Sequence, residues 1–377
     1  TDDTSDYDAA RKQVLKIALV QFLLPKFENE IRNKLYKYSC KLGVKKVSEK
    51  LKKMAMTGPL RPVTLLTESP DIIPTPQVAV VGVILPQSRR ESLSFAAVSP
   101  QGNVVDHFTV PPGKHLEKVE DELKAFLKRS RPTIVVIGTG AGMQARRAER
   151  DLSKFATSAV AEWKDRYNDD EESSDSDDDN DANMNDEYRK KKAKAKARKF
   201  DAQYFSGGDD IGAEWEVPTI AFVDDNVAQL FARSPRGKRE FPEFSVQLRG
   251  AVGLARYAKD PISEIASIWS VISETGKHGV EMLYLNLHPM QKTLPRNALL
   301  KAFERVLLDS VCAVGVDINS AADSDHLGGT LQFVPGLGPR KALALKQNLR
   351  KTGRKVTLRQ DLLTLKYLDE TVYTNAA

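Results

Sequence analysis

The chain has 377 residues and a mass of 41.9 kDa, which allows two or three domains that each bury a hydrophobic core. Apolar residues make up 41% of the sequence and charged residues 29%, and 57 Lys and Arg against 51 Asp and Glu give a net charge of +6. This balance is that of a globular protein, and it excludes a miniprotein held together by disulfides.

Cysteine and histidine usage argues against a structural metal site. Cys40 and Cys312 stand far apart without a CxxC motif, and the five histidines form no pair at the three- to five-residue spacing of zinc ligands. The longest apolar run, 78–85, is much shorter than the roughly 18 residues of a membrane helix, and the acidic N-terminus is unlike a signal peptide. We therefore expect a soluble intracellular protein in a reducing compartment, with no metal, no cofactor and no membrane contact.

Residues 1–60 carry apolar side chains at the three- and four-residue spacing of amphipathic helices, which predicts a lead-in of two or three helices. Ten Lys or Arg against three Glu fall between residues 26 and 53. Such a basic face can contact phosphates, but it is more often a solvated helix surface, which is the interpretation we favour.

Five prolines between residues 57 and 76 mark a connector, so a second domain is expected from about residue 61. Its predicted elements, in chain order, are strands over 78–85, 93–97 and 104–110, a helix over 116–128, a strand over 133–138, a helix through residue 162, a strand over 218–223 and a helix from about residue 226. The order βββαβαβα is the layout of the RNase H-like fold, in which the first and fourth strands lie side by side and carry metal-binding carboxylates in the nucleases.

A charged insertion interrupts this domain at about 166–212. Residues 168–187 hold eleven Asp or Glu and no base, and residues 189–199 hold eight Lys or Arg and no acid. Such blocks cannot bury apolar surface, and we expect them to be disordered. The acidic run has two interpretations of equal weight, a mimic of nucleic acid that binds histones and an inert solubilising loop.

No strand is predicted beyond residue 260. Apolar spacing predicts helices over 262–272, 295–308 and 339–348, and the segment DINSA at 317–321 offers Asn319 or Ser320 as a helix N-cap. The fold class is therefore α/β plus all-α, with a helical segment (1–60), an RNase H-like domain with a mixed sheet (61–259) and a helical domain (260–377).

The clearest motif is FVPGLGPRKALAL at 333–345, which has the form of a helix-hairpin-helix element. Gly336 and Gly338 can take positive φ and let a phosphate approach the backbone. The helix that Pro339 starts points free amides outward as anion donors. The motif therefore combines the backbone features of a phosphate site with those of a tight turn.

Charge follows the hairpin directly. Arg340 and Lys341 stand at its mouth, and residues 331–360 hold eight bases and no acid. We predict a sequence-independent contact with nucleic acid through Gly336, Gly338, Arg340 and Lys341. The alternative, which the sequence leaves open, is a hairpin that only locks two helices together.

A nuclease of the RNase H-like class needs several carboxylates around two divalent ions, one of them in the first strand. The run 78–85 contains no carboxylate. Asp224 and Asp225 follow a predicted strand, but two acids alone cannot hold two metals, and we interpret them, like Asp317, as helix N-terminal caps. GTGAG at 138–142 resembles a phosphate loop but lacks the GxGxxG spacing.

Five stretches in fixed order resemble the Tex family and its eukaryotic branch, the suppressor-of-Ty-six transcription elongation factors and histone chaperones. They are LVQFLLPKFENEIRNKLYKYS, VAVVGVI, FPEFSVQLRGAVGLARYAKDPISEI, AVGVDINSA and VPGLGPRKALAL. The resemblance covers nearly all of residues 12–377 apart from the charged insertion. The acidic insertion and the wording of IVVIGTGAG and GLGPRKAL are similar to the eukaryotic branch.

In that family the middle domain resembles YqgF and RuvC-type nucleases. Alignment of VAVVGVI on their first strand puts Gly82 where the nucleases have an Asp, places Asp225 near the second carboxylate, and finds no third acid around Arg249. The resemblance therefore implies a nuclease fold without nuclease chemistry. It also implies an internal fragment of a longer protein, because the last residues stop inside what resembles a second hairpin.

The resemblance leads us to predict a non-enzymatic, monomeric core of a nuclear elongation factor and histone chaperone. Its expected partners are the RNA polymerase II elongation complex, histones or the nucleosome, and DNA or RNA without sequence preference. The competing hypothesis is a metal-dependent RNase H or RuvC-like nuclease acting on branched or single-stranded nucleic acid, which Asp224 and Asp225 motivate.

Overall fold

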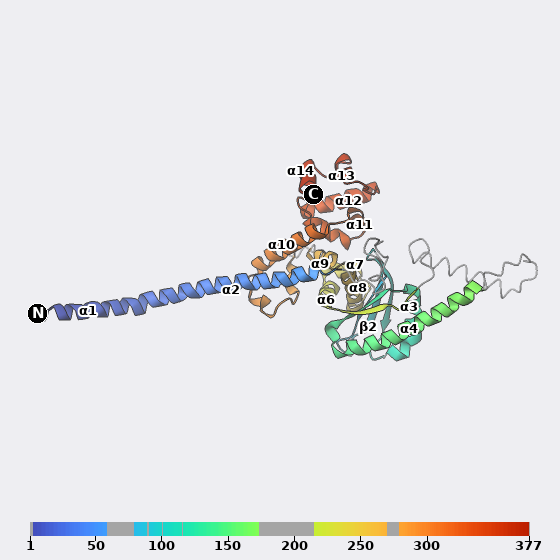
Figure 1. Cartoon of the computed structure of the whole chain (residues 1–377), viewed down its shortest axis with the longest axis horizontal. Coiled ribbons are helices and arrows are strands. Elements are labelled where there is room, and N and C mark those ends of the chain that lie inside the picture. The colour runs from blue at the N-terminus through green and yellow to red at the C-terminus, as the bar shows by residue number, and fades with distance from the viewer. Residues whose placement is uncertain are drawn as a thin grey trace, which may run out of the picture. The chain divides into compact units, whose positions relative to one another are not determined.

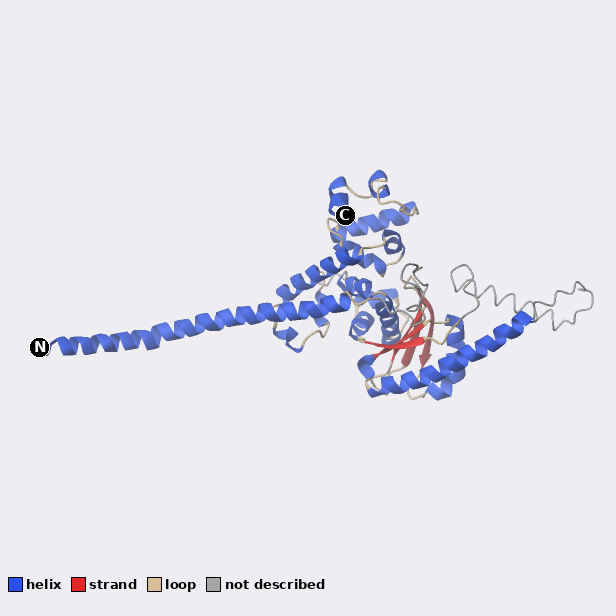
Figure 2. Cartoon of the chain, viewed as in Figure 1, coloured by secondary structure: helices blue, strands red, loops and turns tan. Residues whose placement is uncertain are grey.

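A computed structural model describes residues 3–58, 79–88, 90–99, 101–114, 116–172, 215–269 and 279–376 (Figures 1 and 2). The chain forms two compact units, Thr1–Lys53 with Asn286–Val306, and Met54–Leu285 with Leu307–Ala377. Across these described stretches, no helix combines the length and the apolar character that crossing a bilayer requires.

The first unit is dominated by a long N-terminal helix. It consists of α1 (Asp3–Ile17), a π-helical segment η1 (Ala18–Leu23) and α2 (Leu24–Ala55). The backbone is helical at both junctions, with φ and ψ of −63° and −47° at Ile17 and of −61° and −47° at Leu24. The π-helical segment immediately precedes Pro25, which cannot donate the next α-helical hydrogen bond. Helix was therefore predicted correctly over this region, but the separate helices form one continuous helix.

Most of the apolar stripe on this helix is exposed among the described residues. Phe22 is 69% exposed and Leu35 is 60% exposed, whereas Val47 and Leu51 are fully buried. Near the buried end, a Cβ on Gly43 would lie 2.8 Å from Leu294 Cδ2, so α2 packs closely on the segment 286–306. That segment contains η6 (Pro289–Thr293) and the start of α10 (Arg296–Val314).

A mixed five-stranded sheet forms the centre of the second unit. Its strands are β1 (Val80–Ile84), β2 (Leu93–Val98), β3 (Val104–Val110), β4 (Ile134–Gly138) and β5 (Thr219–Val223), in the order β3-β2-β1-β4-β5. β2 pairs antiparallel with β1 and with β3, and β4 pairs parallel with β1 and with β5. The prediction that the first and fourth strands lie side by side is confirmed. Because β1, β4 and β5 are parallel, their carboxyl ends meet at one edge.

Helices cover both faces of the sheet. Alternate residues of β1 face opposite sides, so Val81 and Val83 pack with α3 (Glu120–Ser130) and α4 (Met143–Glu172). Val80 and Ile84 pack with α6 (Asn226–Arg233) and α8 (Val246–Lys259) on the other side. α4 continues to Glu172, ten residues past its predicted end, so the first residues of the charged insertion, 166–172, are helical where we expected disorder. The rest of the insertion, 173–212, lies outside the described residues.

Helices follow the sheet, as predicted beyond residue 260. They are α7 (Pro235–Glu240), α9 (Pro261–Trp269), η5 (Val280–Tyr284), α11 (Ile318–Asp323), η7 (Leu327–Phe333), α12 (Gly338–Thr352), α13 (Asp361–Thr364) and α14 (Glu370–Asn375). The predicted helix 262–272 corresponds to α9 as far as Trp269, beyond which 270–278 is outside the described part. We call residues 318–376 the hairpin segment, and the sheet with α3, α4, α6 and α8 the α/β layer.

Candidate functional sites

The hairpin has the backbone geometry that its glycines predict. Gly336 has a φ of +86° and Gly338 has a φ of +61°, both in the left-handed region that favours glycine. Pro339 occupies the first turn of α12, where its missing N–H breaks no hydrogen bond. The sequence therefore specified the turn and the helix start correctly.

The two glycines differ in what surrounds them. A Cβ on Gly336 would lie 3.4 Å from Asn375 Cβ and 3.5 Å from Val372 Cγ1, so this exposed glycine lies next to α14 at ordinary contact distance. A Cβ on Gly338 would meet nothing within 4 Å. Val372 is itself only 5% exposed and packs with Leu337 in a small apolar core. Gly336 is therefore both exposed and next to α14, whereas Gly338 has free space where a side chain would stand.

The cations that follow the hairpin fall into two groups. Arg340 and Lys341 are exposed, and neither has an ion pair or hydrogen bond with another described residue. The same holds for three further exposed cations beyond the middle of α12, which are Lys351, Arg354 and Lys355. These five side chains are available to a polyanion.

The other cations near the hairpin are used within the chain. Asp325 Oδ1 accepts from Lys346 Nζ at 2.6 Å and from Arg350 Nη2 at 2.8 Å, and these hydrogen bonds lower the pKa of Asp325. Arg350 Nε also donates to the Ala322 carbonyl at 2.6 Å, which caps the end of α11. Arg359 lies over the Tyr373 ring at 4.6 Å. Two bases of the acid-free stretch 331–360 are thus paired with Asp325, an acid outside that stretch. The sequence alone did not indicate this pairing.

The carboxyl ends of the parallel strands carry the second candidate site. Asp225 follows β5 and is 7% exposed, and a Cβ on Gly140 would lie only 2.5 Å from Asp225 Oδ2. Burial raises the pKa of Asp225, although hydrogen bonds from Gln229 and the Gly140 backbone partly oppose this. Gln229 Nε2 donates to Asp225 Oδ2 at 3.4 Å.

The two neighbouring acids have different roles. Asp224 Oδ1 accepts from the Asn226 backbone N–H at 3.0 Å, which is the capping bond that we predicted. Asp225 stands at the N-cap position of α6, but its side chain makes no capping bond, so the prediction of a cap is wrong for this residue. Asp317 caps α11 through the Asn319 N–H, as predicted.

Gly82 lies against helix α8. A Cβ on Gly82 would lie 2.1 Å from the Ala251 carbonyl oxygen and 2.9 Å from the Ala255 nitrogen. The side chain that stands beside Asp225 is instead Ile84, since a Cβ on Gly138 would lie 3.2 Å from both Ile84 Cδ1 and Asp225 Cβ. Positions 82 and 84 share one face of β1, so the same face of the strand meets α8 at Gly82 and carries Ile84 toward Asp225.

The region around Arg249, where a third carboxylate would be expected in a nuclease, contributes no acid to the site at Asp225. Arg249 is 7% exposed, and its Nη1 lies 3.5 Å from the Phe241 carbonyl oxygen. Within the described ranges, no group of three or more His, Cys, Asp or Glu side chains lies close enough to hold a metal ion. The geometry at the sheet edge is that of one buried carboxylate beside an aliphatic side chain.

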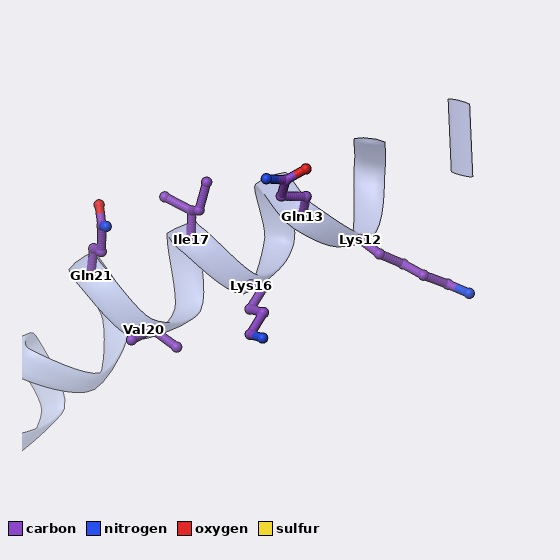
Figure 3. Close-up of a pocket in the computed structure, with 6 residues that line it drawn as sticks. All are labelled: Lys12, Gln13, Lys16, Ile17, Val20 and Gln21. Atoms are coloured by element: carbon purple, nitrogen blue, oxygen red, sulfur yellow. The ribbon is translucent and has the colours of Figure 1, made fainter. Parts of the chain in front are cut away.

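Hollows on the surface offer little for a small ligand. The one shown in Figure 3 runs along α1 and η1 and is lined by Lys12, Gln13, Lys16, Ile17, Val20 and Gln21. All six residues belong to one continuous helix, so no opposite wall encloses a ligand. A second hollow, beside the carboxyl ends of β1 and β4, is lined by Pro86, Gln87, Gly140, Ala141 and Gln144.

Comparison with known proteins shows which family the chain is similar to. A family model for the helix-hairpin-helix motif matches residues 280–377. The chain is 26% identical over 289 residues to transcription elongation factor spt-6 of Neurospora crassa, which covers 77% of this chain and 17% of that protein. It is 22% identical over 385 residues to transcription elongation factor SPT6 of Drosophila melanogaster, which covers 99% of this chain and 18% of that protein. Over nearly all of its length the chain is similar to Spt6 elongation factors.

Other Spt6 proteins match a shorter part more closely. Transcription elongation factor SPT6 of Eremothecium gossypii is 34% identical over 161 residues, which is 43% of this chain and 10% of that protein. The chain spans only a small part of the length of the Spt6 proteins it matches. That part is 10% of the Eremothecium gossypii protein and 22% of the homolog in Caenorhabditis briggsae. The family resemblance expected from five sequence stretches is confirmed.

Proposed function

We propose that this chain is a non-enzymatic part of an Spt6-type transcription elongation factor that works by presenting binding surfaces. The observation that carries this proposal is the Spt6 similarity over 99% of the chain. The divisions 1–60, 61–259 and 260–377 are proposed as its helical, RNase H-like and helix-hairpin-helix parts. The strand order of the sheet supports the second assignment.

The sheet edge supports a role without catalysis. Metal-assisted phosphodiester cleavage needs carboxylates that converge on the ions. Here β1 presents Ile84 beside Asp225, and a side chain at Gly82 would run into α8. Asp225 also has a raised pKa, which makes it a poorer ligand for a divalent cation.

The proposed nucleic-acid surface is the open side of the hairpin. Gly338 leaves space at the start of α12, and Arg340 and Lys341 are exposed beside it. Amides at a helix N-terminus together with two cations suit a phosphate group of any sequence. Gly336, which is exposed beside α14, is proposed as the edge of this surface.

The wider role is proposed from the family. We place the chain in the nucleus as a monomer that contacts the RNA polymerase II elongation complex, histones and nucleosomal DNA. The charged insertion is a candidate for the histone contact because eleven acids stand without a base in residues 168–187. A crosslinking map of the chain within an elongation complex tests which surface meets polymerase and which meets histones.

The nucleic-acid proposal is tested by the salt dependence of DNA binding. Replacement of Arg340 and Lys341 by Glu is expected to weaken duplex binding and to reduce the slope of log K against log salt by about two, because each lost phosphate contact removes about one. Replacement of the exposed Lys114 and Lys118 by Glu makes the same charge change elsewhere and serves as the control. An unchanged slope in a folded double variant at positions 340 and 341 would make the hairpin purely structural.

A further inference from the structure

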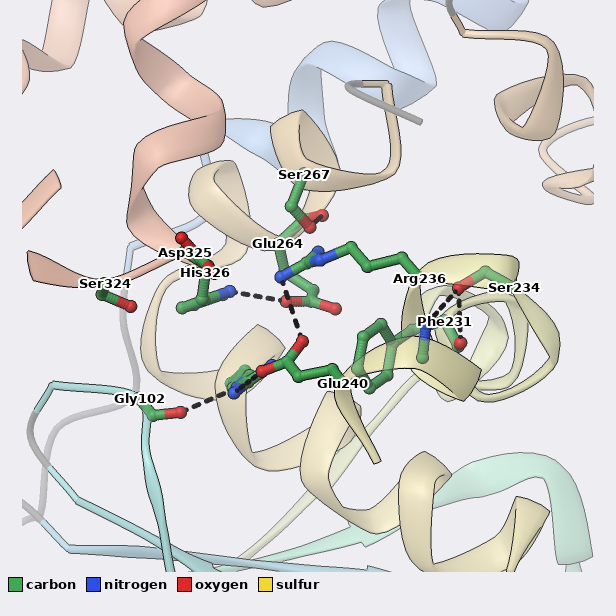
Figure 4. Close-up of polar contacts among 12 residues, drawn as sticks. Gly102, Phe231, Ser234, Arg236, Glu240, Glu264, Ser267, Ser324, Asp325 and His326 are labelled. Carbon is green, nitrogen blue, oxygen red and sulfur yellow. Dashed lines mark hydrogen bonds and ion pairs between the residues drawn. The ribbon is translucent and has the colours of Figure 1, made fainter. Parts of the chain in front are cut away.

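Buried charged side chains lie where the hairpin segment meets helices α7, α8 and α9 (Figure 4). Glu264 on α9 has a fully buried side chain, and the side chain of His326, at the entry to η7, is 3% exposed. His326 Nδ1 lies 2.9 Å from Glu264 Oε2. This pair joins the hairpin segment to the helices that follow the sheet.

The same imidazole touches the sheet. Gly102, in the turn between β2 and β3, has a φ of +86°, and a Cβ on it would lie 2.9 Å from His326 Cδ2. The Gly102 carbonyl accepts from Arg256 Nε at 2.7 Å. His326 is therefore enclosed by the β2–β3 turn on one side and by Glu264 on the other.

The contacts continue through two more charged residues. Arg256 Nη2 lies 2.5 Å from Glu240 Oε1, and Glu240 Oε2 lies 3.7 Å from Arg236 Nη2. Arg236 also bears on Glu264 electrostatically. We call Arg236, Glu240, Arg256, Glu264 and His326 the buried charge ring.

The ring is balanced only when the imidazole is neutral. Its two arginines and two glutamates cancel, so a protonated His326 would add one positive charge beside the buried Arg256 and Glu264, with only Arg236 and Glu240 partly open to solvent. A buried charge without compensation is costly because it loses hydration and gains no partner. A neutral imidazole that carries its hydrogen on Nδ1 can donate to Glu264 at no such cost.

The directions in which the pKa values of His326 and Glu264 shift agree with a neutral imidazole in the ring. Burial lowers the pKa of His326, and Arg256 and Arg236 lower it further, against the opposing effect of Glu264. Burial alone would raise the pKa of Glu264, but the hydrogen bond with His326 and the two arginines outweigh it, so that pKa is lowered. Near neutral pH the ring therefore contains an ionised Glu264 and a neutral His326.

We propose that the buried charge ring is an acid-sensitive joint, which holds the hairpin segment on the α/β layer and opens when His326 takes up a proton. The joint is independent of the proposed nucleic-acid contact, because Arg340 and Lys341 are not part of it. Its opening would move the hairpin segment while leaving the sheet folded.

The surrounding charges do not titrate in the same range. Asp325, beside His326 in the sequence, pairs with Lys346 and Arg350, and its pKa is lowered by the hydrogen bond from Lys346. Burial lowers the pKa of Lys259 on α8 to about 8, so this lysine loses its proton above neutrality and keeps it below. Lys259 is thus mostly protonated at pH 7.5 and fully so at 5.5, and His326 is the group at the joint that gains a proton on opening as pH falls below about 6.5.

The direction of the pH effect follows from linkage. A histidine whose folded pKa lies below the unfolded value of about 6.5 stabilises the folded form fully above that pH. Each pH unit below 6.5 shifts the equilibrium toward the opened, protonated form by up to tenfold, until the folded pKa is reached. At pH 5.5 the opened population should therefore be larger than at pH 7.5, by up to about tenfold.

Hydrogen exchange on the full chain measures this opening. After correction for the intrinsic exchange rate, peptides from α11 and α12 are expected to exchange faster at pH 5.5 than at pH 7.5, by up to about tenfold, while β1 and β4 stay equally protected. Equal protection of the hairpin segment at both pH values would overturn the proposal. Parallel loss of protection in the sheet would also overturn it, because the opening would then be global.

Variants show whether the pH effect comes from protonation of His326 or from general acid destabilisation of the protein. His326→Asn keeps an N–H donor in the Nδ1 position but cannot titrate, so the difference between the two pH values should disappear. Glu264→Gln leaves the two arginines opposite one glutamate and should open the hairpin segment already at pH 7.5. Asp325→Asn removes an exposed acid next to the joint and should keep the wild-type difference. An acid step that persists in His326→Asn would contradict the proposal.

A spectroscopic measurement on the unmodified chain serves if a variant does not fold. Nitrogen-15 chemical shifts of the imidazoles should show His326 neutral with its hydrogen on Nδ1 at pH 7.5, and the neutral form should persist in the closed state at pH 5.5. A protonated His326 in a fully protected hairpin segment at pH 5.5 would overturn the proposal.

Discussion

Gly82 stands so close to Ala251 that a Cβ would lie 2.1 Å from the Ala251 carbonyl oxygen. Real Cβ atoms do not approach a carbonyl oxygen so closely, so β1 and α8 meet backbone to backbone at this point. The glycine is therefore required by packing. If Gly82 stands where the alignment predicted the nuclease Asp, the missing carboxylate and the close fit of α8 are two aspects of one contact.

Substitution at Gly82 should destabilise the α/β layer. Gly82→Ala is expected to lower the free energy of unfolding by about 3 kcal/mol, because α8 must move away from β1. Gly82→Asp should cost more, since it also buries a carboxylate without a partner. Trp163 and Trp215 pack edge to face within this layer, so urea unfolding followed by their fluorescence reports the change. Gly58→Ala, with nothing within 4 Å of the added atom, is the control.

Asp225 should tolerate neutralisation. Its pKa is raised above the ordinary value by burial, so its ionised form costs stability, and the chain should become more stable as pH falls through the raised pKa. Asp225→Asn is expected to be neutral or stabilising by up to about 1 kcal/mol at pH 7.5 and to remove that pH dependence. Thermal unfolding at several pH values measures both effects. A loss of more than about 1 kcal/mol at pH 7.5 would show that the carboxylate is needed for folding.

Glu162 should make the folded chain less stable as pH falls, which is the opposite of the effect expected for Asp225. Hydrogen bonds from Lys128 and Lys124 lower its pKa to about 2, so its contribution is present above the unfolded value and is lost as pH falls from about 4.5 toward 2. The carboxylate is 42% exposed, and solvent screening limits the contribution to about 1 kcal/mol. Glu162→Gln should remove this step. The exposed pair of Glu28 and Arg32 should show almost no effect in Glu28→Gln.

The stability of the hairpin segment should depend on the packing of α14 within it. Val372→Ala is expected to cost about 2 kcal/mol in the hairpin segment, because the side chain is 5% exposed and packs beside Gly336 and Leu337. Hydrogen exchange of α12 measures the loss locally. Thr374→Ala lies in the same helix, where its hydroxyl bonds only to the Glu370 carbonyl, and should cost less than about 1 kcal/mol. Equal effects of the two substitutions would contradict the packing role of Val372.

Local sequence rules predicted a large part of this fold. Apolar runs and turn residues located all five strands, and the pairing of β1 with β4 followed from their order. Positive φ at Gly336 and Gly338 and the cap at Asp317 are short-range properties, which the residue types determine directly.

What depended on distant contacts could not be predicted in the same way. The pairing of Lys346 and Arg350 with Asp325 joins residues more than twenty positions apart, so the basic stretch overstated the free charge. The partners of Glu264 come from other helices, and nothing in the segment PISEI indicates a buried carboxylate. The exposed stripe on α1 and α2 has the same spacing as a buried one, because periodicity reports amphipathic character and not the presence of a partner.

Cleavage of nucleic acid is the most direct test of a scaffold without catalysis. The full chain is incubated with Mg²⁺ or Mn²⁺ and with branched and single-stranded substrates, next to Asp225→Ala prepared in the same way. We expect no cleavage by either protein above the level of buffer alone, while the unmodified chain still binds DNA. Metal-dependent cleavage that Asp225→Ala abolishes would contradict the account and identify the sheet edge as an active nuclease site.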